Sequence, residues 1–279
     1  MRSMVGVWRF ARVLFYILFC IFVVRVKFPK ADRATRGRLI RDHSRRILEM
    51  AGVTFTFAGE GLPASFVETG LSEGKGVTVI SNHVSWLDVF SLDAAIPGCF
   101  VAKADIANWP FFGVIARGIG TLFIERGKRS SIVKINRDIS EALERGETVS
   151  VFAEGTTTCG NELLRLKSNL MAPAASLSST VLPVVLFYSA DGKPTTRMAF
   201  AGNIPLARAL WDTVTLRNPC VTVYALEAIK TEGMDRREIG ELCEKRMRAK
   251  LHELWGGEFK EFDPEAEKAL MAAISRDKN

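Results

Sequence analysis

Residues 77–95, VTVISNHVSWLDVFSLDAA, decide the fold, because a β-branched run passes directly into a segment with helical signals. We predict a buried strand over Val77–Ser81 and a helix over Trp86–Ala95, with Ser85 as the N-cap of the helix. A strand followed by a helix is the unit of α/β proteins. His83 then falls at the carboxyl end of the strand, where open α/β sheets place their sites.

The same alternation continues along the chain after Gly52. It predicts an α/β fold with a mixed, mostly parallel sheet flanked by helices. The expected strands are Val53–Phe57, Val77–Ser81, Cys99–Ala102, Gly120–Ile124, Thr148–Phe152, Val181–Leu186 and Cys220–Ala225. The expected helices are Trp86–Ala95, Pro110–Arg117, Ser130–Arg145, Asp235–Leu254 and Glu265–Ser275.

The first 50 residues differ in composition from the rest. They carry twelve Lys and Arg against three Asp and Glu, whereas the whole chain has a net charge of +7, so the basic excess lies at one end. Between Arg12 and Arg25 lies VLFYILFCIFVV (13–24). This apolar run is shorter than the roughly 20 residues of a membrane span. Basic residues on both flanks predict an embedded or re-entrant segment that returns to the same anionic leaflet.

Residues 30–50, KADRATRGRLIRDHSRRILEM, predict a basic amphipathic helix with apolar residues at Leu39, Ile40, Ile47 and Leu48. Such a helix suits lipid headgroups. The alternative is a core helix with a solvated basic face. We therefore expect a membrane-docking segment over 1–50 and an αβ domain over 51–279. Nucleic acid is not an expected partner, because the basic excess lacks interleaved stacking aromatics.

The cysteine and histidine content excludes a zinc site by spacing. Five cysteines show no CxxC pairing, and only three histidines occur. Zinc-type ligand spacing is therefore absent, and we expect no metal or cofactor. A reduced, cytosol-facing compartment is the default for such a chain.

His83 and Asp88, five positions apart, form a pair suited to proton transfer. In a continuous helix their side chains would point about 140° apart, so a contact requires His83 to precede the helix. Asp88 would then bind one imidazole nitrogen and leave the other to take a proton. No G-x-S-x-G elbow occurs, which predicts that the nucleophile is a substrate hydroxyl. The alternative is a capping box formed by Ser85 and Asp88, with His83 an ordinary loop residue.

Two later stretches end expected strands at the same rim. GTLFIERGKR (120–129) places Arg126 there, and VFAEGTTTCG (151–160) places Glu154, Gly155 and Thr156 there. An arginine offers two parallel donors to a phosphate, and a Gly-Thr turn offers N–H groups and a hydroxyl. Their joint placement predicts an anion site beside His83.

With these blocks the chain resembles the glycerolipid acyltransferases, typified by 1-acylglycerol-3-phosphate acyltransferase. The resemblance rests on NHVSWLD (82–88), KADIANWPFFGVIARGIGTLFIER (103–126), FAEGT (152–156) and VLPVVL (181–186). It implies an acyltransferase in which His83 is the general base and Asp88 orients it. The acyl group would pass from acyl-CoA or an acyl carrier protein, as co-substrate, to a lysophospholipid hydroxyl, first of all 1-acylglycerol-3-phosphate. It also implies a two-helix membrane-docking motif ahead of the αβ domain, on the cytoplasmic face of a membrane, the inner membrane for a bacterial source.

The resemblance further implies headgroup contacts from Arg126, Glu154, Gly155 and Thr156, with help from Lys103 and from Lys167 at a matching basic position. One departure concerns Thr157, where many members that use phosphate acceptors have arginine. The EGTT form is similar to that of some lyso-ornithine lipid acyltransferases, which keeps that acceptor as an alternative. A thioesterase, or a membrane-binding module that does not use His83, are alternatives from other classes.

Overall fold

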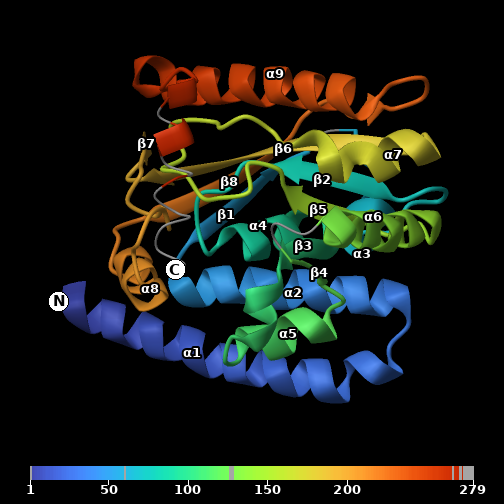
Figure 1. The fold of residues 1–279 in the computed structure, drawn as a ribbon. Coiled ribbons are helices and arrows are strands. Elements are labelled where there is room, and N and C mark those ends of the chain that lie inside the picture. Colours follow the sequence, from blue (N-terminus) through green and yellow to red (C-terminus); the bar gives the residue numbers. More distant parts are fainter. Residues whose placement is uncertain (1, 60, 126–128, 266, 270–271, 273–279) are drawn as a thin grey trace.

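A mixed sheet in the order β1-β8-β6-β2-β5-β3-β4 forms the centre of the molecule (Figure 1). The structure is a computed structural model that describes residues 2–59, 61–125, 129–265, 267–269 and 272. Two short strands, β7 and β9, pair with β6. The strands are β1 (Thr54–Ala58), β2 (Val77–Ser81), β3 (Cys99–Lys103), β4 (Leu122–Ile124), β5 (Val149–Phe152), β6 (Thr180–Ala190), β7 (Lys193–Pro194), β8 (Pro219–Ala225) and β9 (Ile229–Lys230).

The strand directions confirm the predicted mixed, mostly parallel sheet. β2 pairs in parallel with β5 and β6, and β3 does so with β4 and β5. β8 runs antiparallel to β6, with β1 parallel to β8 at that edge. All five residues of β2 are buried, as expected for a β-branched strand covered by helices on both faces.

Helices cover both faces of the sheet, and each face has its own hydrophobic core (Figure 1). One core includes residues of α6, α7 and α9, and the other includes residues of α1, α2, α4 and α8. The helices are α1 (Arg2–Val26), α2 (Arg33–Ala51), α3 (Ala64–Thr69), α4 (Asp88–Ala95), α5 (Phe112–Gly118), α6 (Arg129–Glu144), α7 (Ala172–Leu177), α8 (Leu206–Val214) and α9 (Arg236–Trp255). Short 3-10 turns are η1 (Phe28–Lys30), η2 (Ala104–Asn108), η3 (Ser168–Met171) and η4 (Gly256–Glu258).

Four of the five predicted helices are present as α4, α5, α6 and α9. The helix predicted from Trp86 begins at Asp88, two residues later. α9 begins with a capping box between Asp235 and Glu238, the strongest start signal in the chain. The helix expected over Glu265–Ser275 falls partly outside the described residues.

α1 extends beyond the apolar run 13–24 at both ends, and the predicted embedded or re-entrant placement stays a prediction. Arg9 and Arg12 precede the run in sequence and lie toward the body. Arg9 donates to the carbonyl oxygen of Val214 at 3.2 Å, and the Arg12 Nε contacts the Met50 sulfur at 3.1 Å. Among the described residues one helical stretch, residues 4–30, is long and apolar enough to cross a membrane by length and composition.

α2 forms as predicted, but its apolar residues face the protein and not a lipid surface. Ile47 and Leu48 are buried in a core shared with α4, and Leu39 and Ile40 pack on the small cluster around Phe28. This packing is that of the alternative, a core helix with a solvated basic face, and contact of the basic face with lipid headgroups stays a prediction. The predicted docking segment also shares its core with the αβ domain.

Candidate active site

His83 follows the carboxyl end of β2 and lies against the aromatic ring of Phe152. The two rings are stacked, with centroids 4.0 Å apart and planes at 12°. The His83 side chain is 25% exposed, so one edge of the ring stays open. Within the described part of the chain, Nε2 has no hydrogen-bond partner, whereas Nδ1 is bound. This leaves Nε2 as the nitrogen able to take a proton from a substrate.

Asp88 is fully buried at the first residue of α4 and holds His83 in place. Its Oδ2 lies 2.6 Å from the His83 Nδ1 and also accepts the backbone N–H groups of Val84 and Ser85, at 2.6 and 2.9 Å. The predicted His–Asp contact is therefore present, with His83 ahead of the helix. The carboxylate also accepts two N–H groups of the turn before α4. The predicted Ser85 N-cap is wrong, because the N-cap of α4 is Leu87 and, among the described residues, no side chain caps it.

Tyr188 completes the surroundings of Asp88 from β6. Its hydroxyl donates to the Asp88 Oδ1 at 2.5 Å, and its side chain is fully buried. Burial and the neighbouring Asp88 charge raise the pKa of Tyr188 well above its ordinary value. The phenol therefore remains a donor throughout the physiological range.

Glu154, predicted to contact an acceptor headgroup, is instead buried beneath the site. Its Oε1 accepts the backbone N–H of His83 at 2.8 Å, and its Oε2 accepts that of Leu164 at 2.9 Å. Burial raises the pKa of Glu154 to about 8. Both oxygens are used inside the protein, so we assign Glu154 to the positioning of the His83 backbone.

The Gly155–Thr157 turn is also partly occupied by internal contacts. Gly155 has a φ of +75° and its N–H donates to the carbonyl oxygen of Phe152 at 3.1 Å. A Cβ at Gly155 would lie 2.8 Å from the Lys167 Nζ, so glycine lets the lysine pass over the turn. The Thr157 hydroxyl donates to the carbonyl oxygen of Phe200 at 2.5 Å. The prediction that Lys167 lies near this turn is therefore confirmed. The Gly155 amide and the Thr157 hydroxyl, by contrast, have partners within the protein.

Lys103 and Thr156 both lie at the carboxyl edge of the sheet, Lys103 as the last residue of β3 and Thr156 after β5. Lys103 is half-buried at the carboxyl end of β3, one strand away from β5. Thr156 is half-buried within the turn. Arg126 lies outside the described residues, so its predicted contact with a headgroup stays a prediction.

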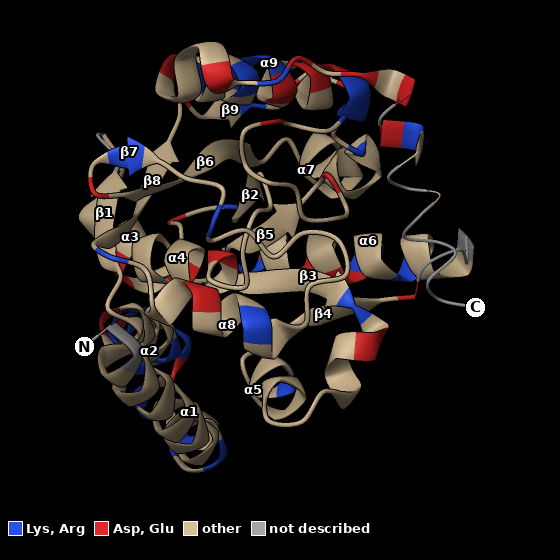
Figure 2. Ribbon diagram, turned by 90° about the vertical axis from the view of Figure 1, so that its left-hand side faces the viewer, with Lys and Arg blue, Asp and Glu red and all other residues tan. Residues whose placement is uncertain are grey.

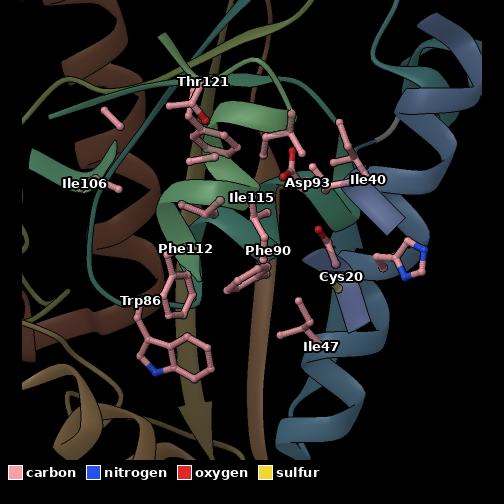
Figure 3. A pocket seen from close by; sticks show the side chains of 18 of the residues that line it. Cys20, Ile40, Ile47, Trp86, Phe90, Asp93, Ile106, Phe112, Ile115 and Thr121 are labelled. Carbon is pink, nitrogen blue, oxygen red and sulfur yellow. The ribbon is translucent and has the colours of Figure 1, made fainter. Parts of the chain in front are cut away.

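An apolar cavity of about 240 Å³ is lined by His83 and by residues of α1, α2, α4 and α5. Figure 3 shows Trp86 and Phe112 toward one end and Thr121 toward the other. Asp93 is a buried acid in this lining and accepts the Gly98 N–H at 3.1 Å. Burial raises the pKa of Asp93 well above its usual range.

Comparison with known proteins places this geometry in a family. A family model described as acyltransferase matches residues 63–187. A protein of Neisseria meningitidis serogroup B named 1-acyl-sn-glycerol-3-phosphate acyltransferase is 36% identical over 232 residues, which are 80% of this chain and 87% of that protein. This chain belongs to the acyltransferase family. It is an enzyme of that class, as the resemblance predicted.

Other relatives of this acyltransferase differ in the acceptor that their names state. A Pseudomonas aeruginosa protein named lyso-ornithine lipid O-acyltransferase is 35% identical over 190 residues, covering 68% of this chain and 73% of that protein. The crystal structure of the 1-acyl-sn-glycerophosphate acyltransferase from Thermotoga maritima covers 91% of this chain and 98% of that chain, with a TM-score of 0.68 at 20% identity. That likeness confirms the fold.

Two features of the acyltransferase site were missed by sequence reasoning. Tyr188 lies 100 positions from Asp88 and looks like one more strand residue in the sequence. Asp93 carried the signal of a lone acid inside an apolar helix, five residues after Asp88. The cavity could not be found in this way, since the walls of an apolar channel read as core in one dimension.

Proposed function

We propose that this acyltransferase moves a fatty acyl group from a thioester to the free hydroxyl of a lysolipid. The observation that carries the proposal is the His83–Asp88 pair, with His83 in the lining of the apolar cavity. The pair supplies a base, His83, whose ring is partly exposed. The cavity supplies space for a hydrocarbon chain. The names of relatives support a lysolipid as the acceptor.

In the proposed reaction His83 is the catalytic base. Its Nε2 takes the proton of the acceptor hydroxyl while the oxygen attacks the thioester carbonyl, so that a C–O bond forms and the C–S bond breaks. The imidazolium, which Asp88 stabilises, then gives this proton to the leaving thiolate. The products are an ester and a free thiol, and no covalent enzyme intermediate is required.

The donor is proposed to place its acyl chain in the apolar cavity with the thioester near His83. Each buried CH₂ group contributes about 0.8 kcal/mol, so aromatic and aliphatic walls such as Trp86, Phe90 and Ile115 favour a chain. Acyl-CoA and acyl carrier protein both carry such a thioester. No cofactor enters the scheme.

The acceptor headgroup is proposed to bind at the rim formed by Lys103, Thr156 and Lys167, with Arg126 as a further contact. Two lysines beside one hydroxyl favour an anion, because hydrogen bonds to charged groups are worth about 1.5–3 kcal/mol. This chemistry supports 1-acylglycerol-3-phosphate, whose product would be phosphatidic acid.

Transfer of a labelled acyl group from acyl-CoA to a panel of lysolipids, with products identified by mass, tests the proposal. His83→Ala should lower kcat by roughly 10²–10⁴, the contribution of a positioned general base. His252→Ala, on the exposed side of α9, is the matched control and should transfer at the wild-type rate. Release of free fatty acid without any acylated lysolipid would identify a thioesterase instead. Transfer at the wild-type rate by folded His83→Ala would contradict the proposed role of His83 as the base.

Lyso-ornithine lipid is the second candidate acceptor, and Thr157 is the observation that favours it. Thr157 lacks the positive charge of the arginine that many phosphate-using members have at this position. Its hydroxyl donates to the carbonyl oxygen of Phe200. In competition between the two acceptors, Thr157→Arg should raise the share of the phosphatidic acid product. An unchanged ratio of product masses would mean that position 157 does not contact the headgroup.

We also propose that α1 docks the enzyme on the cytoplasmic face of a membrane. Ten large apolar side chains of α1 are exposed, and α1 also packs on the body through Val13, Ile17 and Val23. A helix covered by protein along one side is suited to lying in the interface, not to crossing the bilayer alone.

A further inference from the structure

A second cavity, of about 300 Å³, lies at the amino ends of β3 and β5, between α2 and α5. His83 follows the carboxyl end of β2, which is parallel to β5. The two cavities therefore open at opposite edges of the sheet. We propose that the second cavity binds the phosphate group of an anionic membrane lipid that is not the substrate, a role beyond the proposed transfer reaction.

The lining of this cavity is strongly basic. Arg33 and Arg36 come from α2, Arg117 from α5, and Arg145 from the end of α6. Figure 2 shows basic residues in blue on α2 and on α5. Among the described residues that line the cavity, Glu147 is the one acid, so three positive charges remain in excess.

The single acid is shared by two of the arginines. Arg145 binds both oxygens of Glu147, at 3.0 and 2.9 Å, and the Arg33 Nε lies 3.3 Å from one of them. The Arg33 and Arg145 side chains are still 55% and 41% exposed. A guanidinium has five N–H donors, so donors remain for a bound anion after these contacts are made.

Arg36 and Arg117 are both exposed and are fixed by backbone carbonyl groups instead of acids. The Arg36 Nε donates to the carbonyl oxygen of Phe28 at 2.9 Å, and the Arg117 Nη1 donates to that of Ala107. A carbonyl orients a guanidinium without neutralising it. These two arginines therefore bring their full charges to the cavity.

Close backbone packing around the cavity depends on glycine. A Cβ on Gly37 of α2 would lie 2.0 Å from the Thr69 carbonyl oxygen, and one on Gly118 of α5 would lie 1.9 Å from Val24. Both distances are shorter than real Cβ contacts, so glycine lets α2 lie against Thr69 at the end of α3 and lets α5 lie against Val24 of α1. The arginines are held around the cavity by the fold itself.

An amphiphile fits this cavity better than a free ion. Its lining includes the apolar residues Phe28, Ile40 and Ile119, which also line the apolar cavity. α1 ends directly before Phe28, with Phe22 and Val26 exposed by 54% and 42%. A lipid could thus lay its chains along α1 and its phosphate among the arginines, where guanidinium pairs with phosphate are strong.

The test measures binding of the full chain to phosphatidylcholine vesicles with and without phosphatidylglycerol, in the absence of any acyl donor. Arg36→Gln and Arg117→Gln should raise the Kd for the anionic vesicles about tenfold. Arg46→Gln is the matched control, since Arg46 lies on α2, is 53% exposed and pairs with Glu49 outside the cavity. It removes the same charge and should change the Kd less than about twofold.

Equal effects of all three substitutions would overturn the proposal, because diffuse attraction depends on charge and not on place. Inorganic phosphate is the second probe. If Arg36→Gln and Arg117→Gln weakened binding of inorganic phosphate but left the Kd for anionic vesicles unchanged, the cavity would belong to a free phosphate and the lipid would be overturned. Melting temperatures of both cavity variants verify folding, and the two arginines lie on separate helices. Because no acyl transfer is measured, a failure here leaves the proposed reaction untouched, and the reverse also holds.

Discussion

Asp88 is the residue on which the site depends, because its two carboxylate oxygens join three segments of the chain. Oδ2 serves His83 and the turn before α4, and Oδ1 receives the Tyr188 hydroxyl from β6. A buried carboxylate is costly without partners. These donors hold the charge in place, so the imidazole has a single orientation from which to act.

Tyr188→Phe should therefore lower kcat and leave KM for both substrates nearly unchanged. The substitution keeps the ring and removes one hydrogen bond to a carboxylate, worth about 1.5–3 kcal/mol, so kcat should fall by roughly tenfold or more. Steady-state kinetics of acyl transfer measure the two constants. Tyr224→Phe, on β8 with its ring near Lys250, is the control, and a fall in stability with wild-type kcat would reduce Tyr188 to a packing residue.

At the scale of elements, α1 combines a buried side with an exposed apolar side. Arg9 and Arg12 turn to the body, and the exposed large apolar side chains extend from Met4 to Val26, with Arg25 exposed at the carboxyl end. Deleting residues 1–50 would also remove Ile47 and Leu48 from the core. Single substitutions on the outer surface therefore test docking more cleanly than truncation.

Phe15→Asp should weaken binding to vesicles by about tenfold or more, because burying a phenylalanine contributes roughly 1.5–3 kcal/mol. Phe15 is 74% exposed on α1. Val133→Asp, at an equally exposed apolar position of α6 (72%), is the matched control. Flotation with vesicles measures both variants, and equal binding of Phe15→Asp and wild type would place the membrane contact elsewhere.

At the scale of the whole molecule, Glu154 links the site to global stability. It joins the backbone of His83 to that of Leu164 between the two cores. Its folded-state pKa of about 8 lies above the ordinary 4.5. The folded protein therefore binds more protons than the unfolded chain between these values, so this contribution is complete below pH 4.5 and is lost as the pH rises through about 8.

Glu154→Gln should flatten the fall of the free energy of unfolding between about pH 5 and pH 8, since glutamine does not titrate. Urea unfolding at a series of pH values measures the slope. Glu141→Gln, on an exposed position of α6, should keep the wild-type slope. If the two variants and the wild type had the same slope, Glu154 would have to be ionised throughout this range.

The sequence by itself determined the alternation of strands and helices and the contact between His83 and Asp88. The physical reason is that these features are local. A β-branched run of five residues predicts β2 whatever packs on it, and His83 and Asp88 are joined by a turn that their own backbone closes. The helices α3 and α7 have six residues each, too few to show a helical period, and they were not predicted. The helix α8 was also missed, although its buried residues Ala209, Leu210, Thr213 and Val214 follow a helical period.

Only the tertiary structure decided which surfaces face each other. α2 had the composition of a lipid-facing helix, but α4 covers its apolar side, and α1 supplies the exposed apolar face instead. Glu154 sits at a strand end like a ligand-binding acid, yet the chain folds backbone N–H groups over both of its oxygens. Tyr188, the apolar cavity and the arginine-lined cavity each join segments far apart in sequence, and no local pattern records such contacts.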